Sequence, residues 1–269
     1  MTNEPIRLLA LDLDGTLFDF SSQFSPRVRW AIAQAQRRGL AVTLATGRSI
    51  TSTRPFAQEL DIREPLICYQ GGWIAETNGP VLHRVALDRN LAAQIIDFAQ
   101  ARHWHVNLYR DGQLYLTELR HPISFYEGLL NPAAQHVPDL HALLDHDPDK
   151  VLIVAEGGNG DEILADLRER FDGRMEIVRT HDLFIEANPL NVDKGTGLAW
   201  LAGRLGVPQS QVMAVGDQDN DVPMVAWAGV GVAMGNGSPA CKAVADWIAP
   251  PLAKDGAAVA IERFVLNAH

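Results

Sequence analysis

An apolar run that ends in two carboxylates is the feature that most constrains the fold of this chain of 269 residues. Residues 6–11 are almost entirely apolar, and the string DLDGT, residues 12–16, follows directly. A strand this apolar is typical of the centre of a parallel sheet, where both faces are buried. Ligands of open α/β sheets bind at the carboxyl edge of the strands. The run therefore predicts a buried parallel strand with an acidic site where it ends.

Further apolar strands are predicted, and each ends in glycine or polar residues. Between the first two strands, apolar residues at helical spacing follow Ser25-Pro26, which has the pattern of a helix N-terminus. Because the carboxyl ends of parallel strands meet at one edge of a sheet, we expect the residues after them to converge. The predicted strands, with the residues that follow them, are 40–45 with Thr46-Gly47, 66–69 with Gln70-Gly71, 212–215 with Gly216-Asp217, and 230–234 with Gly235.

Residues 83–188 have a different pattern. Their strands are shorter, and a stretch rich in proline and histidine runs from residue 121 to residue 148. These features predict a small α+β domain, inserted into the first pattern, which resumes after residue 188. We therefore expect an α/β fold with a Rossmann-like parallel-sheet core, residues 1–82 and 189–269, and an inserted α+β cap, residues 83–188.

Composition argues against several functional classes. A formal net charge of −10 opposes nonspecific binding to nucleic acid or to anionic membranes, so we expect neither partner. No apolar stretch approaches the roughly 18 residues that span a bilayer, and residues 1–5 lack the features of a signal peptide. The expected location is the cytoplasm. The two cysteines, Cys68 and Cys241, fall in apolar segments and are expected to be core residues.

Five charged side chains would share the carboxyl edge of the predicted sheet. They are the carboxylates Asp12, Asp14, Asp217 and Asp221 and a single lysine, Lys194. Each close pair of carboxylates repels by about 4 kcal/mol at a separation of about 4 Å in an effective dielectric near 20. One ammonium does not offset several such pairs, whereas a divalent cation does. Because a ligand set made only of oxygens favours a hard ion, we expect Mg²⁺ at this edge.

Taken in chain order, these residues form four motifs. They are Asp12-x-Asp14-Gly15-Thr16, Thr46-Gly47-Arg48, Lys194 and Gly216-Asp217-x-x-Asn220-Asp221. This order resembles the haloacid-dehalogenase-type phosphatases, and a cap between the third strand and the lysine resembles the Cof-type subfamily. That subfamily includes hydrolases of sugar phosphates and related phosphomonoesters. The resemblance implies a phosphatase whose partner is a small-molecule phosphomonoester.

The resemblance also implies roles for the carboxylates. Asp12 would be the nucleophile that forms an aspartyl-phosphate, and Asp14 would protonate the leaving alcohol and then deprotonate the attacking water. Mg²⁺ would be bound by the Asp12 carboxylate, the Asp14 backbone carbonyl and Asp217. Asp221 would belong to the same metal site, either directly or through water.

Four further residues are implied to hold the phosphate. The Thr46 hydroxyl, the Gly47 amide and the Lys194 ammonium would bind the transferring oxygens. Asn220 would contact the phosphate or orient Lys194. The family commonly has Asn-Gly after the third strand, whereas Gln70 stands there in this chain, and its longer side chain leaves its role open.

Two other functions compete with hydrolysis. A phosphomutase would move the phosphate between positions of one sugar, and a phosphate-binding protein would hold its ligand without turnover. A mutase yields an isomeric sugar phosphate where a hydrolase yields free phosphate. The sequence predicts neither the oligomeric state nor the substrate, and the cap residues considered for substrate specificity are Tyr109, Arg110, His121, Phe125 and Tyr126.

Other motif-like strings fail on their spacing. Residues 217–221 begin like an EF-hand loop, but its sixth position is valine and its twelfth is alanine. The glycines of residues 229–235 miss the dinucleotide-binding fingerprint by one residue, and no Walker A motif occurs. Several histidines match no recognised zinc pattern and are interpreted mostly as surface or packing residues; they are His103, His105, His136, His141 and His146.

Overall fold

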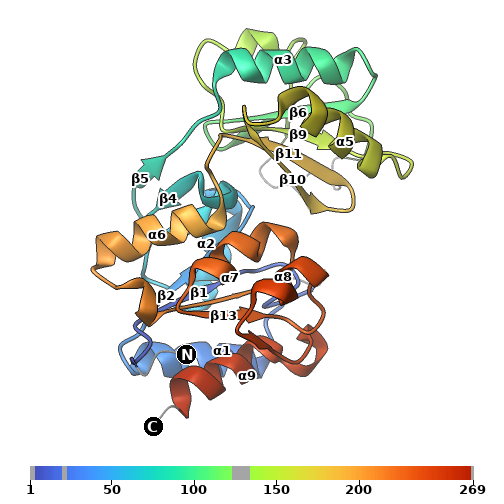
Figure 1. Ribbon diagram of the computed structural model, residues 1–269. Coiled ribbons are helices and arrows are strands. Elements are labelled where there is room, and N and C mark those ends of the chain that lie inside the picture. The colour runs from blue at the N-terminus through green and yellow to red at the C-terminus, as the bar shows by residue number, and fades with distance from the viewer. Residues whose placement is uncertain (1–3, 20–22, 123–133, 268–269) are drawn as a thin grey trace. The chain divides into compact units, whose positions relative to one another are not determined.

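The computed structural model describes residues 4–19, 23–122 and 134–267. The chain divides into two compact units (Figure 1). The first comprises Met1–Gly47, Thr53–His83 and Asp193–His269, and the second comprises Arg48–Ser52 and Arg84–Val192. The roles of catalytic core and specificity cap remain predictions for these units. Within the described ranges, no helix has the length and hydropathy that a bilayer crossing requires.

A five-stranded parallel sheet forms the centre of the first unit, in the order β14-β13-β12-β1-β2. The predicted acidic strand, β1, lies between β2 and β12, and all four of its residues are buried. The predicted parallel α/β core is therefore confirmed. The strands are β1 (Leu8–Leu11), β2 (Ala41–Leu44), β12 (Val212–Gly216), β13 (Val230–Ala233) and β14 (Trp247–Ile248).

Helices cover both faces of this sheet. In Figure 1, α1 and α9 lie together on one side of the sheet, and α6, α7 and α8 lie on the other. Ser25 caps α1 as predicted, since its hydroxyl accepts a hydrogen bond of 3.1 Å from the Val28 amide. The helices of this unit are α1 (Pro26–Arg37), α2 (Ile50–Glu59, from Thr53 on), α6 (Lys194–Leu205), α7 (Val222–Trp227), α8 (Pro239–Val244) and α9 (Gly256–Ile261).

The third predicted strand joins a different sheet from the one expected. β3 (Leu66–Cys68) pairs antiparallel with β4 (Trp73–Ala75), and β5 (Val81–Arg84) completes a three-stranded sheet. A single parallel bridge, Ala45 to Ile67, connects β3 to the segment after β2. Three consecutive residues with positive φ, Tyr69, Gln70 and Gly71, follow β3, so the chain turns into β4 before a longer parallel pairing can form.

A six-stranded sheet, in the order β10-β11-β9-β6-β7-β8, forms the second unit. Helices α3 (Arg89–Gln100) and α5 (Gly160–Phe171) pack on one face of it, where the apolar core of this unit lies (Figure 1). Its strands are β6 (His105–Arg110), β7 (Gln113–Leu116), β8 (Ala134–His136), β9 (Lys150–Val154), β10 (Glu176–His181) and β11 (Phe184–Asn188).

The face of this sheet opposite to the helices carries buried polar side chains. Lys150 and Glu186 form an ion pair of 2.7 Å, and the Lys150 ammonium lies 4.9 Å from the centre of the Tyr109 ring. Asn107 and Asn188 are fully or almost fully buried, and their side-chain amides make no hydrogen bond with any described residue. Buried amides of this kind are costly unless a partner binds them.

Candidate functional site

One lysine joins two carboxylates at the centre of the first unit. The Lys194 ammonium donates hydrogen bonds of 2.7 Å to Asp12 Oδ1 and 2.6 Å to Asp221 Oδ1. Lys194 is the first residue of α6, Asp12 follows β1, and Asp221 precedes α7. All three side chains are buried. Strand ends and helix starts that lie far apart in the sequence therefore meet at one point.

Asp221 also organises the loop after β12. Its second oxygen, Oδ2, accepts hydrogen bonds from the backbone amides of Asp217, at 2.8 Å, and Gln218, at 2.9 Å. A Cβ on Gly216 would lie 2.5 Å from the Asp221 side chain, so only glycine leaves room for this contact. Asp221 thus fixes both the ammonium and the backbone that carries Asp217.

Asp217 is held by side chains on both sides. The Thr16 hydroxyl donates to its Oδ1 at 3.1 Å, and the side-chain amide of Gln218 donates to its Oδ2 at 3.0 Å. Gly15 adopts a φ of +84°, and a Cβ there would lie 2.3 Å from Asp217 Oδ2. The glycine and the threonine of the DLDGT string are therefore needed for this packing as well as for the turn.

The electrostatics of the cluster indicate a missing positive charge. Burial and the neighbouring Asp221 raise the pKa of Asp12 well above its usual value, and the same two causes raise the pKa of Asp217 to about 6. Burial alone would lower the pKa of Lys194, but the facing carboxylates raise it. With all three buried carboxylates ionised, the one ammonium leaves two negative charges uncompensated.

The carboxylates lie close enough to bind one ion. Asp12, Asp217 and Asp221 each offer an oxygen, and these atoms all lie within 4.8 Å of one another. Asp14 differs from them because its side chain is exposed, although its charge contributes to the raised pKa of Asp12. Asp219 is exposed too. The cluster supplies only oxygen atoms, as hard divalent cations prefer.

Three of the four residues expected to bind phosphate, Thr46, Gly47 and Asn220, lie beside Gln70. Asn220 was expected to contact the phosphate or to orient Lys194. Its side-chain amide donates a hydrogen bond of 3.1 Å to Gln70 Oε1, whereas Lys194 is held by Asp12 and Asp221. A Cβ on Gly47 would lie 2.3 Å from Gln70 Nε2, which places the Gln70 amide directly against this glycine. Thr46 is buried, and its backbone carbonyl accepts a hydrogen bond of 3.1 Å from the backbone amide of Gln70.

The family follows from comparison with known proteins. A family model described as haloacid dehalogenase-like hydrolase matches residues 9–261, which is nearly the whole chain. The chain is a haloacid dehalogenase-like hydrolase. It is 30% identical over 263 residues to the 5-amino-6-(5-phospho-D-ribitylamino)uracil phosphatase YcsE of Bacillus subtilis, covering 97% of this chain and 96% of that one.

Two further similarities agree with this family. An HMP-PP phosphatase of Serratia proteamaculans is 28% identical over 243 residues, covering 88% of this chain and 87% of the relative. A crystal structure of a haloacid dehalogenase-like hydrolase from Bacteroides thetaiotaomicron superposes with a TM-score of 0.84 at 30% identity, covering 96% of this chain and 99% of that one. With phosphatases among its relatives, this haloacid dehalogenase-like hydrolase is a phosphatase enzyme.

Several residues of this hydrolase that shape the site were not predicted from the sequence. Thr16 and Gln218 position Asp217, and Thr16 was visible as the last residue of the DLDGT string. Asn236 donates to the Gly15 carbonyl at 2.8 Å and accepts from the Leu252 amide at 2.7 Å. The only sequence signal for Asn236 was its place shortly after β13. Spacing in the sequence does not reveal which backbone groups its side chain joins.

The residues considered for specificity lie in the second unit of the hydrolase. Tyr109 belongs to its polar sheet face. Arg110 forms an ion pair of 2.8 Å with Asp145, and His121 lies 3.1 Å from a Glu156 oxygen. Phe125 and Tyr126 fall outside the described residues.

Proposed function

We propose that this phosphatase hydrolyses small phosphomonoesters in two steps, with Mg²⁺ as cofactor and an aspartyl-phosphate on Asp12 as intermediate. The observation that carries the proposal is the buried cluster of Asp12, Asp217 and Asp221 around Lys194. With its carboxylates ionised, this cluster has two negative charges without a counterion. An uncompensated buried charge destabilises the fold, so the imbalance favours a functional role for the cluster.

Mg²⁺ fits the donor set. The three carboxylates offer oxygen ligands at mutual distances within 4.8 Å, a divalent cation balances their charge, and hydrolases of this family generally use Mg²⁺. We assign its binding to Asp12, Asp217 and the Asp14 backbone carbonyl, with Asp221 close by. When bound, Mg²⁺ offsets the repulsion between the nucleophile and the phosphate.

In the first step, a carboxylate oxygen of Asp12 attacks the phosphorus, and the bond from phosphorus to the alcohol oxygen breaks. The exposed Asp14 gives its proton to that oxygen, so the alcohol leaves neutral. Lys194 already contacts Asp12 at 2.7 Å and is the cation best placed to stabilise the phosphoryl oxygens. Thr46 and the Gly47 amide supply further donors.

In the second step, Asp14 takes a proton from water, and the resulting hydroxide attacks the phosphorus. The bond from phosphorus to Asp12 breaks, which releases phosphate and restores the carboxylate. Asp221 keeps its hydrogen bond to Lys194 when Asp12 is esterified, so the ammonium stays in place. The Gln70 and Asn220 amides form one side of the phosphate position.

We assign substrate selection to the second unit. Its polar sheet face, with Asn107, Tyr109, Lys150, Glu186 and Asn188, suits a leaving group rich in hydrogen-bonding groups. The named activities of the relatives support testing a phosphorylated ribityl pyrimidine and HMP-PP beside sugar phosphates.

Phosphate release from a panel of these compounds tests the proposal. We expect turnover by the full chain with Mg²⁺ and its loss in EDTA. Asp12→Asn should fold normally and lose at least about a thousandfold in rate, because an amide is not a nucleophile here. Asp219→Asn is the matched control, since that carboxylate is exposed. Undiminished activity of Asp12→Asn, or isomeric sugar phosphate as the product, would contradict the proposal.

A further inference from the structure

We propose that His105, His121 and Glu156, in the second unit, form a binding site for a divalent transition-metal ion, with Zn²⁺ as the best match. The site is separate from the Asp12 cluster and belongs to a different compact unit. Nothing in the proposed phosphatase mechanism uses these three side chains.

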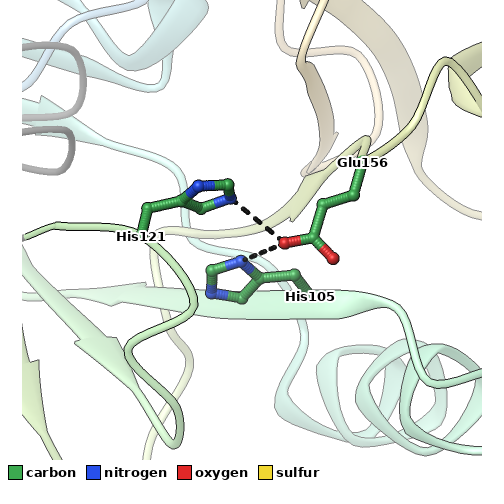
Figure 2. A group of neighbouring side chains, drawn as sticks. All are labelled: His105, His121 and Glu156. Carbon is green, nitrogen blue, oxygen red and sulfur yellow. Dashed lines mark ion pairs between the residues drawn. The ribbon is translucent and has the colours of Figure 1, made fainter.

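Three different segments bring the ligands together. His105 begins β6, His121 lies beyond the end of β7, and Glu156 follows β9 by two residues. Figure 2 shows both imidazole rings facing the Glu156 carboxylate. The rings stack with their centres 5.7 Å apart and an angle of 20° between their planes. Convergence from three segments explains why no spacing pattern in the sequence revealed the site.

The distances fit a tetrahedral ion. His105 Nδ1 lies 3.4 Å and His121 Nε2 lies 3.1 Å from the same oxygen, Glu156 Oε1. Zinc bonds of about 2.0–2.1 Å to nitrogen and oxygen place tetrahedral ligand atoms about 3.3 Å apart. All three ligand atoms lie within 4.8 Å of one another, so a small inward movement of one imidazole completes the set.

The chemistry of the ligands also suits a transition metal. Two imidazole nitrogens and one carboxylate are preferred by Zn²⁺ and its neighbours, whereas Mg²⁺ and Ca²⁺ prefer oxygen. Burial lowers the pKa of His105, which favours the neutral form of the ring that binds metal ions. Arg120 contacts the other oxygen, Glu156 Oε2, at 3.2 Å and so orients Oε1 toward the histidines.

Partial exposure of the site leaves a fourth coordination position for a water molecule. The side chains of His121 and Glu156 are 31% and 35% exposed, whereas His105 is 2% exposed. The ligand nitrogens of His105 and His121 are themselves buried, so a metal ion would enter past the exposed parts of His121 and Glu156, where a water molecule would be its fourth ligand. Bound metal would fix the segment after β7 to the sheet.

A titration with metal alone tests the site. The full chain, stripped of metal and then saturated with Mg²⁺ to fill the carboxylate cluster, is titrated with Co²⁺ and then with Zn²⁺. We expect one equivalent of Co²⁺ with the strong visible absorption of a four-coordinate ion, displaced by Zn²⁺. His121→Ala and Glu156→Gln should each weaken binding by more than the roughly 10–100-fold that loss of an outer partner causes.

The control is His141→Ala. His141 also pairs with a carboxylate, at 3.0 Å from Asp97, but within the described ranges it belongs to no group of three metal-ligating side chains, so its replacement should leave Co²⁺ binding unchanged. Absence of Co²⁺ binding to the wild type, or affinity in both ligand variants equal to that of the wild type, would overturn the proposal. Asp12→Asn should not alter this binding, so the result is independent of the phosphatase assay.

Discussion

Lys194 is the residue on which the carboxylate cluster depends. It is 1% exposed, and among the described residues it is the only cation that forms ion pairs with both Asp12 and Asp221. A buried charge left without its partner is strongly destabilising. The same side chain therefore serves stability and the proposed chemistry.

Replacement of this lysine should affect both properties. For Lys194→Met without added metal, we expect the free energy of unfolding at pH 7 to fall by about 3–5 kcal/mol, because Asp12 and Asp221 lose their counterion. Phosphate release should fall by about 10²–10³-fold. Urea unfolding and a phosphatase assay measure the two effects. The exposed Lys254→Met is the control, and equal unfolding midpoints for the two variants would show that Lys194 does not hold the cluster.

Gln70 combines a site contact with an unfavourable backbone conformation. Its φ is +57°, which costs an L-residue about 1–2 kcal/mol relative to glycine. Gln70→Ala and Gln70→Gly both remove the contact with Asn220, so their difference isolates the backbone. We expect the glycine variant to be more stable by about 1 kcal/mol in urea unfolding.

A second pair of variants provides the comparison for Gln70. Gln58 is exposed and lies in the last turn of α2, where glycine is less favourable than alanine by up to about 1 kcal/mol. The order of the two variants should therefore reverse at this position. Finding alanine more stable at both positions would mean that the positive φ of Gln70 carries no cost.

At the scale of elements, α6 packs unusually close to its neighbours. A Cβ on Gly197 would lie 2.8 Å from the Ile67 side chain and 2.9 Å from the Gly71 backbone. Asp193 caps the helix, accepting a hydrogen bond of 2.7 Å from the Thr196 amide. This close approach and this cap fix the first turn of α6, which carries Lys194.

Two glycines of α6 should respond oppositely to alanine. Helix propensity favours alanine by up to about 1 kcal/mol, but overpacking costs about 1–3 kcal/mol. We expect Gly197→Ala to lower stability and phosphatase activity. Gly203 lies in the same helix, and a Cβ there would meet nothing within 4 Å, so Gly203→Ala should raise stability. Thermal unfolding measures both, and a stabilising Gly197→Ala would show that β3 and α6 readily separate.

The sequence predicted the core elements that have strong local signals. The apolar runs of β1, β12 and β13 and the cap of α1 were sufficient because each pattern is complete within a few residues. Helix α3 was missed, although Asp88 caps it and its buried residues, Ala92, Ile95, Ile96 and Ala99, follow helical spacing. The assignment of β3 to the main sheet was wrong because the positive-φ turn after β3 pairs it with β4, and the sequence gives no clear signal for that turn.

The candidate site was also predictable only in part. Residue types at strand ends indicated the carboxylates and Lys194, since a parallel sheet brings its carboxyl ends together. The choice of partner was not predictable: Lys194 contacts Asp221 as well as Asp12, and Asn220 contacts Gln70. Such contacts depend on side-chain rotamers and loop geometry that a single sequence does not encode locally.

At the scale of the whole molecule, the charge imbalance predicts stabilisation by Mg²⁺. At a concentration about 100 times its Kd, Mg²⁺ should add about 2.7 kcal/mol to the free energy of unfolding. Thermal unfolding with MgCl₂, compared with NaCl of equal ionic strength, measures this. Asp217→Asn should remove the effect and Asp219→Asn should retain it. Equal stabilisation of both variants would assign the effect to the overall charge of −10 instead.

The order of strands in the first sheet has a consequence during synthesis of the chain. β1 pairs with β2 on one edge, but its other edge pairs with β12, where Leu8 lies opposite Val212. The ribosome makes the second unit, which has its own apolar core, between these two strands. Until β12 emerges, the nascent chain therefore carries an apolar strand with one unpaired edge, which is the kind of surface that chaperones protect from aggregation.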